Sequence, residues 1–174
     1  VLEAETAAFG ASGRNGGFCE ASLTHGLANG LAHWPDELHT LLRFGDENLD
    51  DLMDTINRHA IDCNAERTGT MDIAVEPWQV DELQGLAEAS SRLGVDHALL
   101  DTEAIRAEID SPTYLAGLWQ RTGAAMVDPA RLAWGLQSAA KSLGVIFHDH
   151  SPVRSIEKSG TGLELHSDDG RVRT

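Results

Sequence analysis

The chain has 174 residues and a mass of 18.7 kDa, the size of one domain or a large part of one. Hydrophobic residues make up 41%, enough for a packed core, so wholesale disorder is excluded. Asp and Glu number 28 against 13 Lys and Arg, and the resulting net charge of −15 argues against nucleic-acid binding and against docking on an anionic membrane surface.

No apolar run approaches the roughly 20 residues that a membrane-spanning helix needs. Cys19 and Cys63 are the only cysteines, which excludes a disulfide scaffold and a four-cysteine zinc site. Two thiols in an acidic chain suit a reducing compartment, so we expect a cytoplasmic protein. The first residues read as the end of a strand and the last as the start of one, so we expect an internal piece of a longer protein.

The first long element is a helix predicted over residues 35–59. Its apolar positions recur at spacings of three, four and seven residues, which places them on one helical face. They are Leu38, Leu41, Leu42, Leu49, Leu52, Met53 and Ile56. Gly45 is the expected weak point of this helix, and the acidic run over residues 46–54 is expected on its solvated face.

Short strands are predicted over residues 61–63 and 70–75, around a turn at Thr68-Gly69. Pro77 is suited to the first position of a second helix, and Gly94 is expected to end that helix in a left-handed cap. The buried face of this helix would carry Val80, Leu83, Leu86, Ala87 and Leu93.

The next elements are a short strand within residues 95–100 and a small helix that Asp101 or Thr102 caps and that runs to about residue 109. A strand follows over residues 114–119. Asp128-Pro129 is a strong helix start, because Asp favours the N-cap and Pro the first helical position.

The helix that begins at Pro129 is expected to stop at Gly144, and an apolar strand is predicted over residues 145–147. Alternating strands follow over residues 151–158 and 163–167, and a hairpin turn at Asp168-Asp169-Gly170 follows the second strand. The elements together predict a mixed α+β fold with some α/β character.

Several residues that could carry chemistry have simpler interpretations. His148 and His150 would share one face of a strand, but no third ligand has a diagnostic spacing, so no metal site is expected. Cys19 lies beside Glu20, which does not favour an activated thiolate. Ser12 lacks the Gly-x-Ser-x-Gly spacing of a hydrolase nucleophile.

Two features point toward a dinucleotide. Glu3 stands at a strand end, where an acid in a dinucleotide-binding fold accepts hydrogen bonds from a ribose. The glycine-rich stretch over residues 12–17 could point backbone N–H groups at an anion, and Arg14 would add positive charge. By spacing alone, the stretch could equally be a plain loop.

These two segments, Val-Leu-Glu-Ala at the start and Gly-Ala-Ser-Gly-Arg-Asn-Gly-Gly over residues 10–17, resemble the second strand and the flavin-contacting loop of the FAD-dependent amine and amino-acid oxidoreductases. This group includes glycine oxidase, sarcosine oxidase and D-amino-acid dehydrogenase, and the gamma-glutamylputrescine oxidase branch is the most similar. Further similar segments occur in the same order at residues 61–63, 100–106, 128–143 and 144–153, so the resemblance covers nearly the whole chain.

The resemblance implies that the cofactor is FAD, bound in part of a Rossmann-like domain with an inserted substrate-side region. It divides the chain into an FAD-binding segment (residues 1–34), a helical, substrate-side region (35–127) and a return to the FAD-binding domain (128–174). Glu3 would bind the adenosine ribose and Val153 would contact the adenine through its backbone. The pyrophosphate and isoalloxazine would lie along Ser12, Gly13, Arg14, Asn15, Gly16 and Gly17.

The implied reaction removes a hydride equivalent from a carbon that bears an amine, in a small-molecule amine or amino acid, and water hydrolyses the resulting imine. The sequence assigns no catalytic residue and no oligomeric state. The family's Gly-x-Gly-x-x-Gly turn is not among the 174 residues and would precede Val1, so the 174 residues alone are expected to be inactive and to bind FAD weakly or not at all. The alternatives are a flavin dehydrogenase that passes electrons to an acceptor other than oxygen, and a non-catalytic acidic binding module.

Overall fold

The computed structural model describes residues 1–174, which form two compact units. Unit 1 comprises Val1–Gly17, Ile56–Asn64 and Asp128–Thr174, and unit 2 comprises Phe18–Thr55 and Ala65–Val127. None of the helices combines the length and the apolar character needed to cross a bilayer. The five α-helices and nine strands confirm the mixed α/β prediction.

Unit 2 contains two three-stranded sheets in which every neighbouring pair is antiparallel. The first has the order β1-β6-β2, with β1 (Phe18–Glu20), β6 (Ala124–Met126) and β2 (Glu66–Arg67). The second has the order β3-β5-β4, with β3 (Thr70–Ala74), β5 (Ala116–Gln120) and β4 (Ala98–Leu100). The second sheet confirms the strands predicted over residues 70–75 and 114–119, while β1 and β6 had no sequence prediction.

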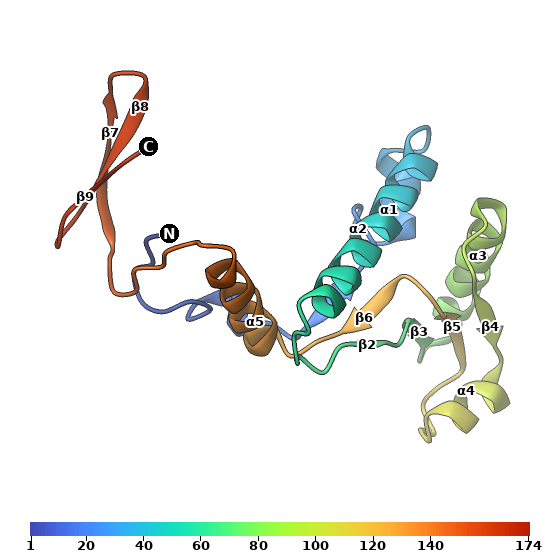
Figure 1. Ribbon diagram of the computed structural model, residues 1–174. Helices are drawn as coiled ribbons and strands as arrows, with labels where there is room; N and C mark the ends of the chain where they lie inside the picture. The colour runs from blue at the N-terminus through green and yellow to red at the C-terminus, as the bar shows by residue number, and fades with distance from the viewer. The chain divides into compact units, whose positions relative to one another are not determined.

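Helix α3 (Pro77–Leu93) packs against the β3-β5-β4 sheet, as Figure 1 shows. The helix begins at Pro77 and ends at Gly94, whose φ of 73° is the predicted left-handed cap. The core between helix and sheet consists of Ala74, Leu83, Ala87, Ala116 and Leu118. Short α4 (Thr102–Glu108) begins where the Asp101 carboxylate accepts a hydrogen bond from the Ala104 N–H at 2.9 Å.

Helix α2 (Leu38–Arg58) confirms the helix predicted over residues 35–59, and the shorter α1 (Leu27–His33) before it had no sequence prediction. Leu49 of α2 is buried with Ala21 and Ala125, which joins the helix to the β1-β6-β2 sheet. Gly45, predicted as the weak point of this helix, has a packing role in the structure. It is buried where α2 meets the backbone of Ala21, and a Cβ atom built on it would lie 2.7 Å from the Ala21 carbonyl carbon.

Unit 1 contains α5 (Pro129–Ser142), which begins as predicted: the Asp128 carboxylate accepts a hydrogen bond from the Arg131 N–H at 3.0 Å. The short 3₁₀ helix η1 (Ala11–Gly13) packs against α5. The strand predicted over residues 61–63 is wrong, because this segment does not pair with another strand. It forms isolated backbone hydrogen bonds instead, such as the one that the Cys63 carbonyl accepts from the Asp128 N–H at 2.7 Å.

The sheet β7-β8-β9 completes unit 1 and is the red segment of Figure 1. Its strands β7 (Val153–Ser159), β8 (Gly162–Ser167) and β9 (Arg171–Arg173) confirm the predicted strands and the turn after the second one. Because side chains alternate along a strand, the register gathers apolar side chains on one face and charged ones on the other. The apolar face carries Ile156, Leu165 and Val172 in adjacent positions.

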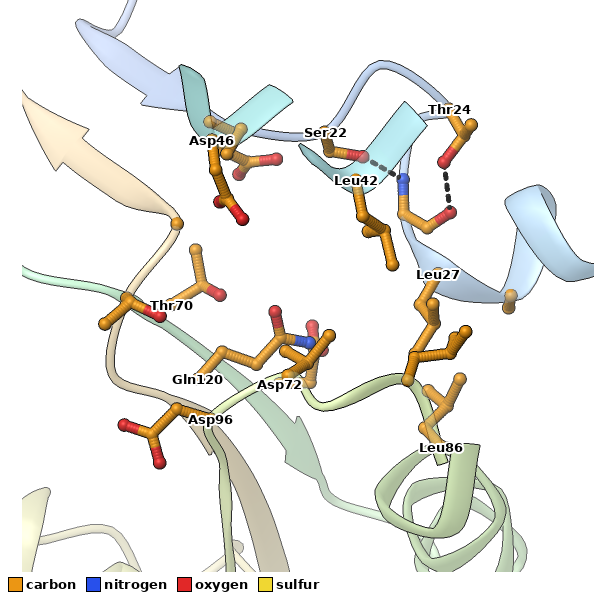
Figure 2. A pocket seen from close by; sticks show the side chains of 18 of the residues that line it. Ser22, Thr24, Leu27, Leu42, Asp46, Thr70, Asp72, Leu86, Asp96 and Gln120 are labelled. Carbon is orange, nitrogen blue, oxygen red and sulfur yellow. Dashed lines mark hydrogen bonds between the residues drawn. The ribbon is translucent and has the colours of Figure 1, made fainter. Parts of the chain in front are cut away.

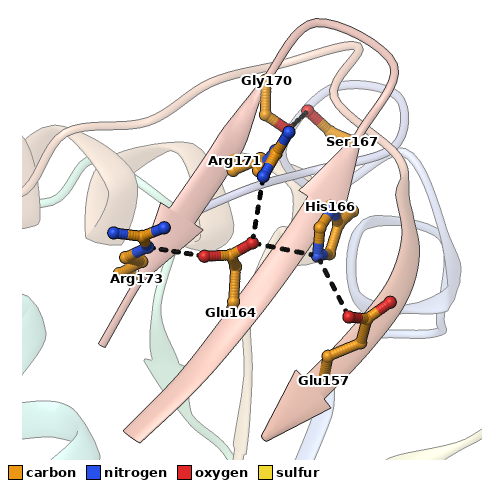
Figure 3. A network of polar contacts seen from close by, with 7 residues as sticks. All are labelled: Glu157, Glu164, His166, Ser167, Gly170, Arg171 and Arg173. Atoms are coloured by element: carbon orange, nitrogen blue, oxygen red, sulfur yellow. Dashed lines mark hydrogen bonds and ion pairs between the residues drawn. The ribbon is translucent and has the colours of Figure 1, made fainter. Parts of the chain in front are cut away.

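The charged face of this sheet is organised around Glu164, which is 8% exposed (Figure 3). Arg173 Nε donates to Glu164 Oε2 at 2.5 Å, and Arg171 Nη1 lies 3.5 Å from Oε1. His166 Nε2 lies 3.3 Å from the same Oε1 and 3.8 Å from Glu157 Oε2. The hydrogen bond from Arg173, together with the charges of Arg173, Arg171 and His166, holds the pKa of Glu164 below its usual value.

We expect the stability of this sheet to depend on pH through Glu164. A carboxyl whose pKa is lowered on folding contributes stability that is present above its unfolded pKa, about 4.3, and is lost as the pH falls through the folded value. Glu164→Gln should therefore lower the urea midpoint near neutral pH and make little difference once the carboxyl is protonated. The exposed Glu157→Gln is the control, and an equal effect of Glu164→Gln at both pH values would contradict the account.

Candidate functional site

Glu3 follows an extended segment that pairs in parallel with residues 146–148. Leu2 and His148 form a parallel bridge, the His148 N–H donates to the Val1 carbonyl at 2.9 Å, and the Glu3 N–H donates to the His148 carbonyl at 2.9 Å. The apolar segment predicted as a strand over residues 145–147 is therefore present as this single bridge rather than as a ladder. Parallel pairing is the arrangement of a dinucleotide-binding sheet, in which ligands bind beyond the carboxyl ends of the strands. Glu3 occupies such an end.

Val153 lies close to Glu3 along the hydrogen-bonded backbone. The Ser151 N–H donates to the Glu3 carbonyl at 2.7 Å, two residues before β7 begins at Val153. Val153 is on an edge strand, and the pairing of β7 with β8 has a β-bulge between Val153 and Ser155. The structure thus places Glu3 next to the residues that lead into β7.

The glycine-rich stretch folds into a compact loop around η1. Asn15 Nδ2 donates to the carbonyls of Ala11 at 3.0 Å and Ser12 at 3.1 Å, and Asn15 Oδ1 accepts from the Gly17 N–H at 2.9 Å. Gly17 has a φ of 76°, which a β-branched residue adopts only with strain. Both Nδ2 hydrogens of Asn15 are used inside the loop, so this side chain organises the loop and has no donor left for a ligand.

Other donors of the loop remain available. The backbone N–H groups of Ser12, Asn15 and Gly16 have no acceptor within the chain. The Arg14 guanidinium lies 4.3 Å from the centre of the Phe9 ring and forms no ion pair. A positive charge beside unpaired N–H groups is suited to an anion such as a phosphate.

We expect Asn15→Ala to loosen the loop. The substitution removes three hydrogen bonds, and each neutral one contributes about 0.5–1.5 kcal/mol to stability. Amide hydrogen exchange of residues 10–17 should become faster, while exchange of β7 and β8 stays unchanged. Ser12→Ala is the control, because the Ser12 hydroxyl forms no hydrogen bond; slower or equal exchange in Asn15→Ala would contradict the prediction.

Trp134 on α5 joins the helix to the segment that leads into this loop. Its indole Nε1–H donates to the Ala7 carbonyl at 3.1 Å. This is the only hydrogen bond between residues 6–17 and the rest of unit 1. The sequence analysis missed this contact, and a tryptophan on a helix of small and aliphatic residues was the available signal.

Unit 2 contains a cavity of about 800 Å³ between α1, α2, α3 and the β3-β5 strands (Figure 2). Its apolar wall includes Leu27, Leu42 and Leu86, which Figure 2 shows on one side. Its polar lining is rich in carboxylates, namely Glu20, Asp46, Glu47, Asp50, Asp72, Glu82 and Asp96. The sequence analysis interpreted residues 46–54 as a solvated helix face; Asp46 and Asp50 are indeed exposed, but they face this cavity.

Acidic residues outnumber basic ones in the lining of the cavity, although Asp50 is paired with Arg67. Burial raises the pKa of Asp46, and the charge of Asp50 raises it further, while Arg67 opposes both effects. The basic residues in the lining are His39 and Arg43. Arg43 is committed to Glu47, since Arg43 Nη1 lies 2.6 Å from Glu47 Oε1. The lining therefore favours a cation over an anion.

The site residues that the sequence predicted fall into two groups in unit 1. Glu3 and Val153 belong to the paired segment at the edge of β7, and Ser12–Gly17 form the loop on α5. No hydrogen bond joins the two groups. No group of three or more His, Cys, Asp or Glu side chains is placed to hold a metal ion.

Comparison with known sequences gives consistent results. The sequence pattern of a family described as FAD dependent oxidoreductase matches residues 1–174. The gamma-glutamylputrescine oxidoreductase of Escherichia coli is 31% identical over 159 residues, covering 90% of this chain and 37% of that protein. A probable oxidoreductase of Haemophilus influenzae, OrdL, is 27% identical over 168 residues, covering 92% and 38%. The chain thus spans well under half the length of these relatives.

Solved structures share the fold. Glycine oxidase from Geobacillus kaustophilus superposes with a TM-score of 0.74 at 20% identity, over 99% of this chain and 45% of that one. L-α-glycerophosphate oxidase from Mycoplasma pneumoniae, solved with FAD bound, also gives 0.74, at 16% identity over 97% and 43%. These similarities confirm that the chain has part of the fold of FAD-binding oxidases.

Proposed function

Because the chain belongs to the family of FAD-dependent oxidoreductases, we propose that it is the part of such an enzyme that holds the adenosine end and the pyrophosphate of FAD and forms one side of the substrate site. The proposed reaction oxidises a C–N bond of an amine to an imine, which water then hydrolyses. The observation that carries the cofactor assignment is the parallel pairing of residues 1–3 with residues 146–148, which leaves a carboxylate at a strand end.

The residues present fit the chemistry of FAD. A ribose donates hydroxyl hydrogen bonds, and the Glu3 carboxylate has an oxygen that remains unused, since only Oε1 accepts a bond, from the Glu5 N–H at 3.1 Å. A pyrophosphate needs positive charge and N–H donors, which Arg14 and the backbone at Ser12, Asn15 and Gly16 supply. Val153 would offer backbone groups to the adenine.

When bound, FAD supplies the acceptor for the hydride equivalent. The chain's own residues would bind and orient the cofactor and the substrate. We assign residues 1–34 and 128–174 to the FAD side and residues 35–127 to the substrate side, and Glu20 and Leu27 of the first segment also line the unit 2 cavity. No side chain of this chain is assigned as a general base, because a neutral amine can transfer a hydride without one.

The charge of the unit 2 cavity supports an amine over an amino acid as the substrate. An amino-acid oxidase needs a cation to receive the substrate carboxylate, and the cavity offers Arg43, which Glu47 already neutralises. An aliphatic diamine has a second, protonated amine for Asp46 and Asp72 and a methylene chain for the leucine wall, while its reacting amine transfers the hydride in the neutral form. Gamma-glutamylputrescine, in the name of the Escherichia coli relative, contains such an amine at its putrescine end, together with an amino-acid group at its glutamyl end.

The proposal is tested by mixing the FAD-loaded protein with candidate substrates in the absence of oxygen. We expect gamma-glutamylputrescine or a simple diamine to remove the visible absorbance of the oxidised flavin, and glycine to do so far more slowly. A diamine acetylated on both nitrogens, which has no free amine at either end, is the control compound. Equal reduction by glycine and by the diamine would contradict the preference for amines, and no reduction by either class would contradict C–N oxidation.

The electron acceptor requires a second measurement. Readmitting oxygen to the reduced protein and measuring hydrogen peroxide separates an oxidase, which releases one peroxide per reduced flavin, from a dehydrogenase. A dehydrogenase would remain reduced in air until a quinone or another carrier is added. We propose the oxidase, with the dehydrogenase as the alternative.

A further inference from the structure

Trp134 is placed to control the loop that the proposed function assigns to FAD. Its indole N–H donates to the Ala7 carbonyl at 3.1 Å, and its ring is 56% exposed, so burial of the ring is not its main contribution. Ala7 immediately precedes Ala8, whose φ of 68° is in the left-handed region that alanine rarely adopts. The hydrogen bond thus holds the chain next to a strained residue.

The strain at Ala8 is linked to the shape of the loop. Gly13 lies so close to Ala8 that a Cβ atom built on Gly13 would be 2.9 Å from the Ala8 Cβ. The path at Ala8 therefore sets the position of η1 and of the Arg14 that follows it. Phe9 is fixed in the same turn, because its N–H donates to the Thr6 carbonyl at 3.0 Å and its ring lies under Arg14.

We infer that Trp134 is a positioning residue for the FAD loop: its N–H anchors residues 7–17 to α5 and so preorders the free donors of the loop. The inference rests on the proposed function, because it assumes that this loop holds the pyrophosphate. Without the Trp134–Ala7 hydrogen bond, residues 7–17 keep only their internal hydrogen bonds. FAD binding would then also have to order this segment, and the lost conformational entropy would weaken the affinity. The expected consequence is faster loss of the flavin with an otherwise intact fold.

The test replaces Trp134 by phenylalanine, which keeps an aromatic ring and removes the N–H. We expect amide hydrogen exchange of residues 7–17 in the 174-residue chain to accelerate about two- to tenfold, the range for one net hydrogen bond. Exchange in unit 2 should not change. Trp78→Phe is the matched control, because Trp78 is similarly exposed, at 59%, and its indole forms no hydrogen bond.

The second readout is the rate at which flavin dissociates from the FAD-loaded protein. If Trp134 only stabilised the fold, its replacement would change this rate and the unfolding temperature together. We expect faster dissociation in Trp134→Phe at an unchanged unfolding temperature. Unchanged exchange in residues 7–17 would overturn the anchoring role, and faster exchange with unchanged flavin dissociation would overturn the link to the cofactor. Neither readout uses a substrate, so a failure of amine oxidation would be seen separately, as a flavin that amines do not reduce.

Discussion

Replacing Gly45 with alanine is expected to destabilise unit 2 by about 3 kcal/mol, at the upper end of the usual cost of overpacking a core. The added methyl group would overlap the Ala21 carbonyl and lie 2.7 Å from its carbon. Ala21 cannot move away cheaply, because its N–H donates to the Gly123 carbonyl at 2.7 Å and its side chain is packed with Leu49. The measurement is urea unfolding of the 174-residue chain followed by circular dichroism.

Gly85→Ala is the matched control for this prediction. Gly85 is also inside a helix of unit 2, but nothing lies within 4 Å of a Cβ atom built on it. Alanine should therefore stabilise α3 by about 0.5–1 kcal/mol, through its higher helix propensity. Opposite signs at the two glycines support the close packing of α2 on the β1-β6-β2 sheet, and a stabilising Gly45→Ala would exclude it.

Replacing Glu3 with alanine is expected to weaken FAD retention about tenfold or more, since hydrogen bonds to a charged group contribute about 1.5–3 kcal/mol. The carboxylate follows the paired segment at residues 1–3, and its free oxygen is the proposed acceptor for the ribose hydroxyls. Flavin content after dialysis of the FAD-loaded protein is the measurement. Glu3→Gln, which keeps an acceptor oxygen but no charge, should fall between the parent and Glu3→Ala.

Glu5→Ala provides the control for charge. Glu5 is two residues away and is also a glutamate, and its side chain forms no hydrogen bond or ion pair. It should retain flavin as the parent does. If Glu3→Ala also retained flavin fully, the ribose contact would belong to another residue.

The sequence predicted α2, α3, α4 and α5, because their boundaries are set by local chemistry, but it did not predict α1. Asp128 and Asp101 cap the helices that follow them, and Gly94 ends α3 with a positive φ, all as predicted. Each of these signals acts within four residues, so no knowledge of distant contacts is needed. The β7-β8-β9 sheet was predictable for the same reason, since short turns connect its strands.

Elements that depend on distant partners were missed. Strands β1 and β6 are three residues each and pair across most of the length of unit 2, as Phe18 with Met126. Residues 61–63, Ile-Asp-Cys, were predicted as a strand because a segment of three alternating residues is too short to distinguish a strand from an irregular segment. Gly45 was interpreted through helix propensity alone. The structure shows that a glycine is needed there because the backbone of Ala21, distant in sequence, approaches closely.

The candidate site was predicted in part. The residue types and spacing around Glu3 and residues 12–17 indicated a ribose acid and an anion-binding loop, yet spacing alone did not show how Asn15 is used. Its amide is consumed by the loop itself, which only the fold reveals. The acid-lined cavity was also beyond prediction, because Asp46 and Asp72 come together from different elements of unit 2.

The most direct test of the cofactor assignment is a titration of the ¹⁵N-labelled 174-residue chain with FAD, followed by the amide chemical shifts. Our account predicts that the shifts of Glu3, of residues 12–17 and of Val153, all in unit 1, change together with a single weak affinity, and that the shifts of unit 2 do not change. Perturbations confined to unit 2, or a loop that stays unchanged while other residues saturate, would contradict the assignment of this chain's FAD site.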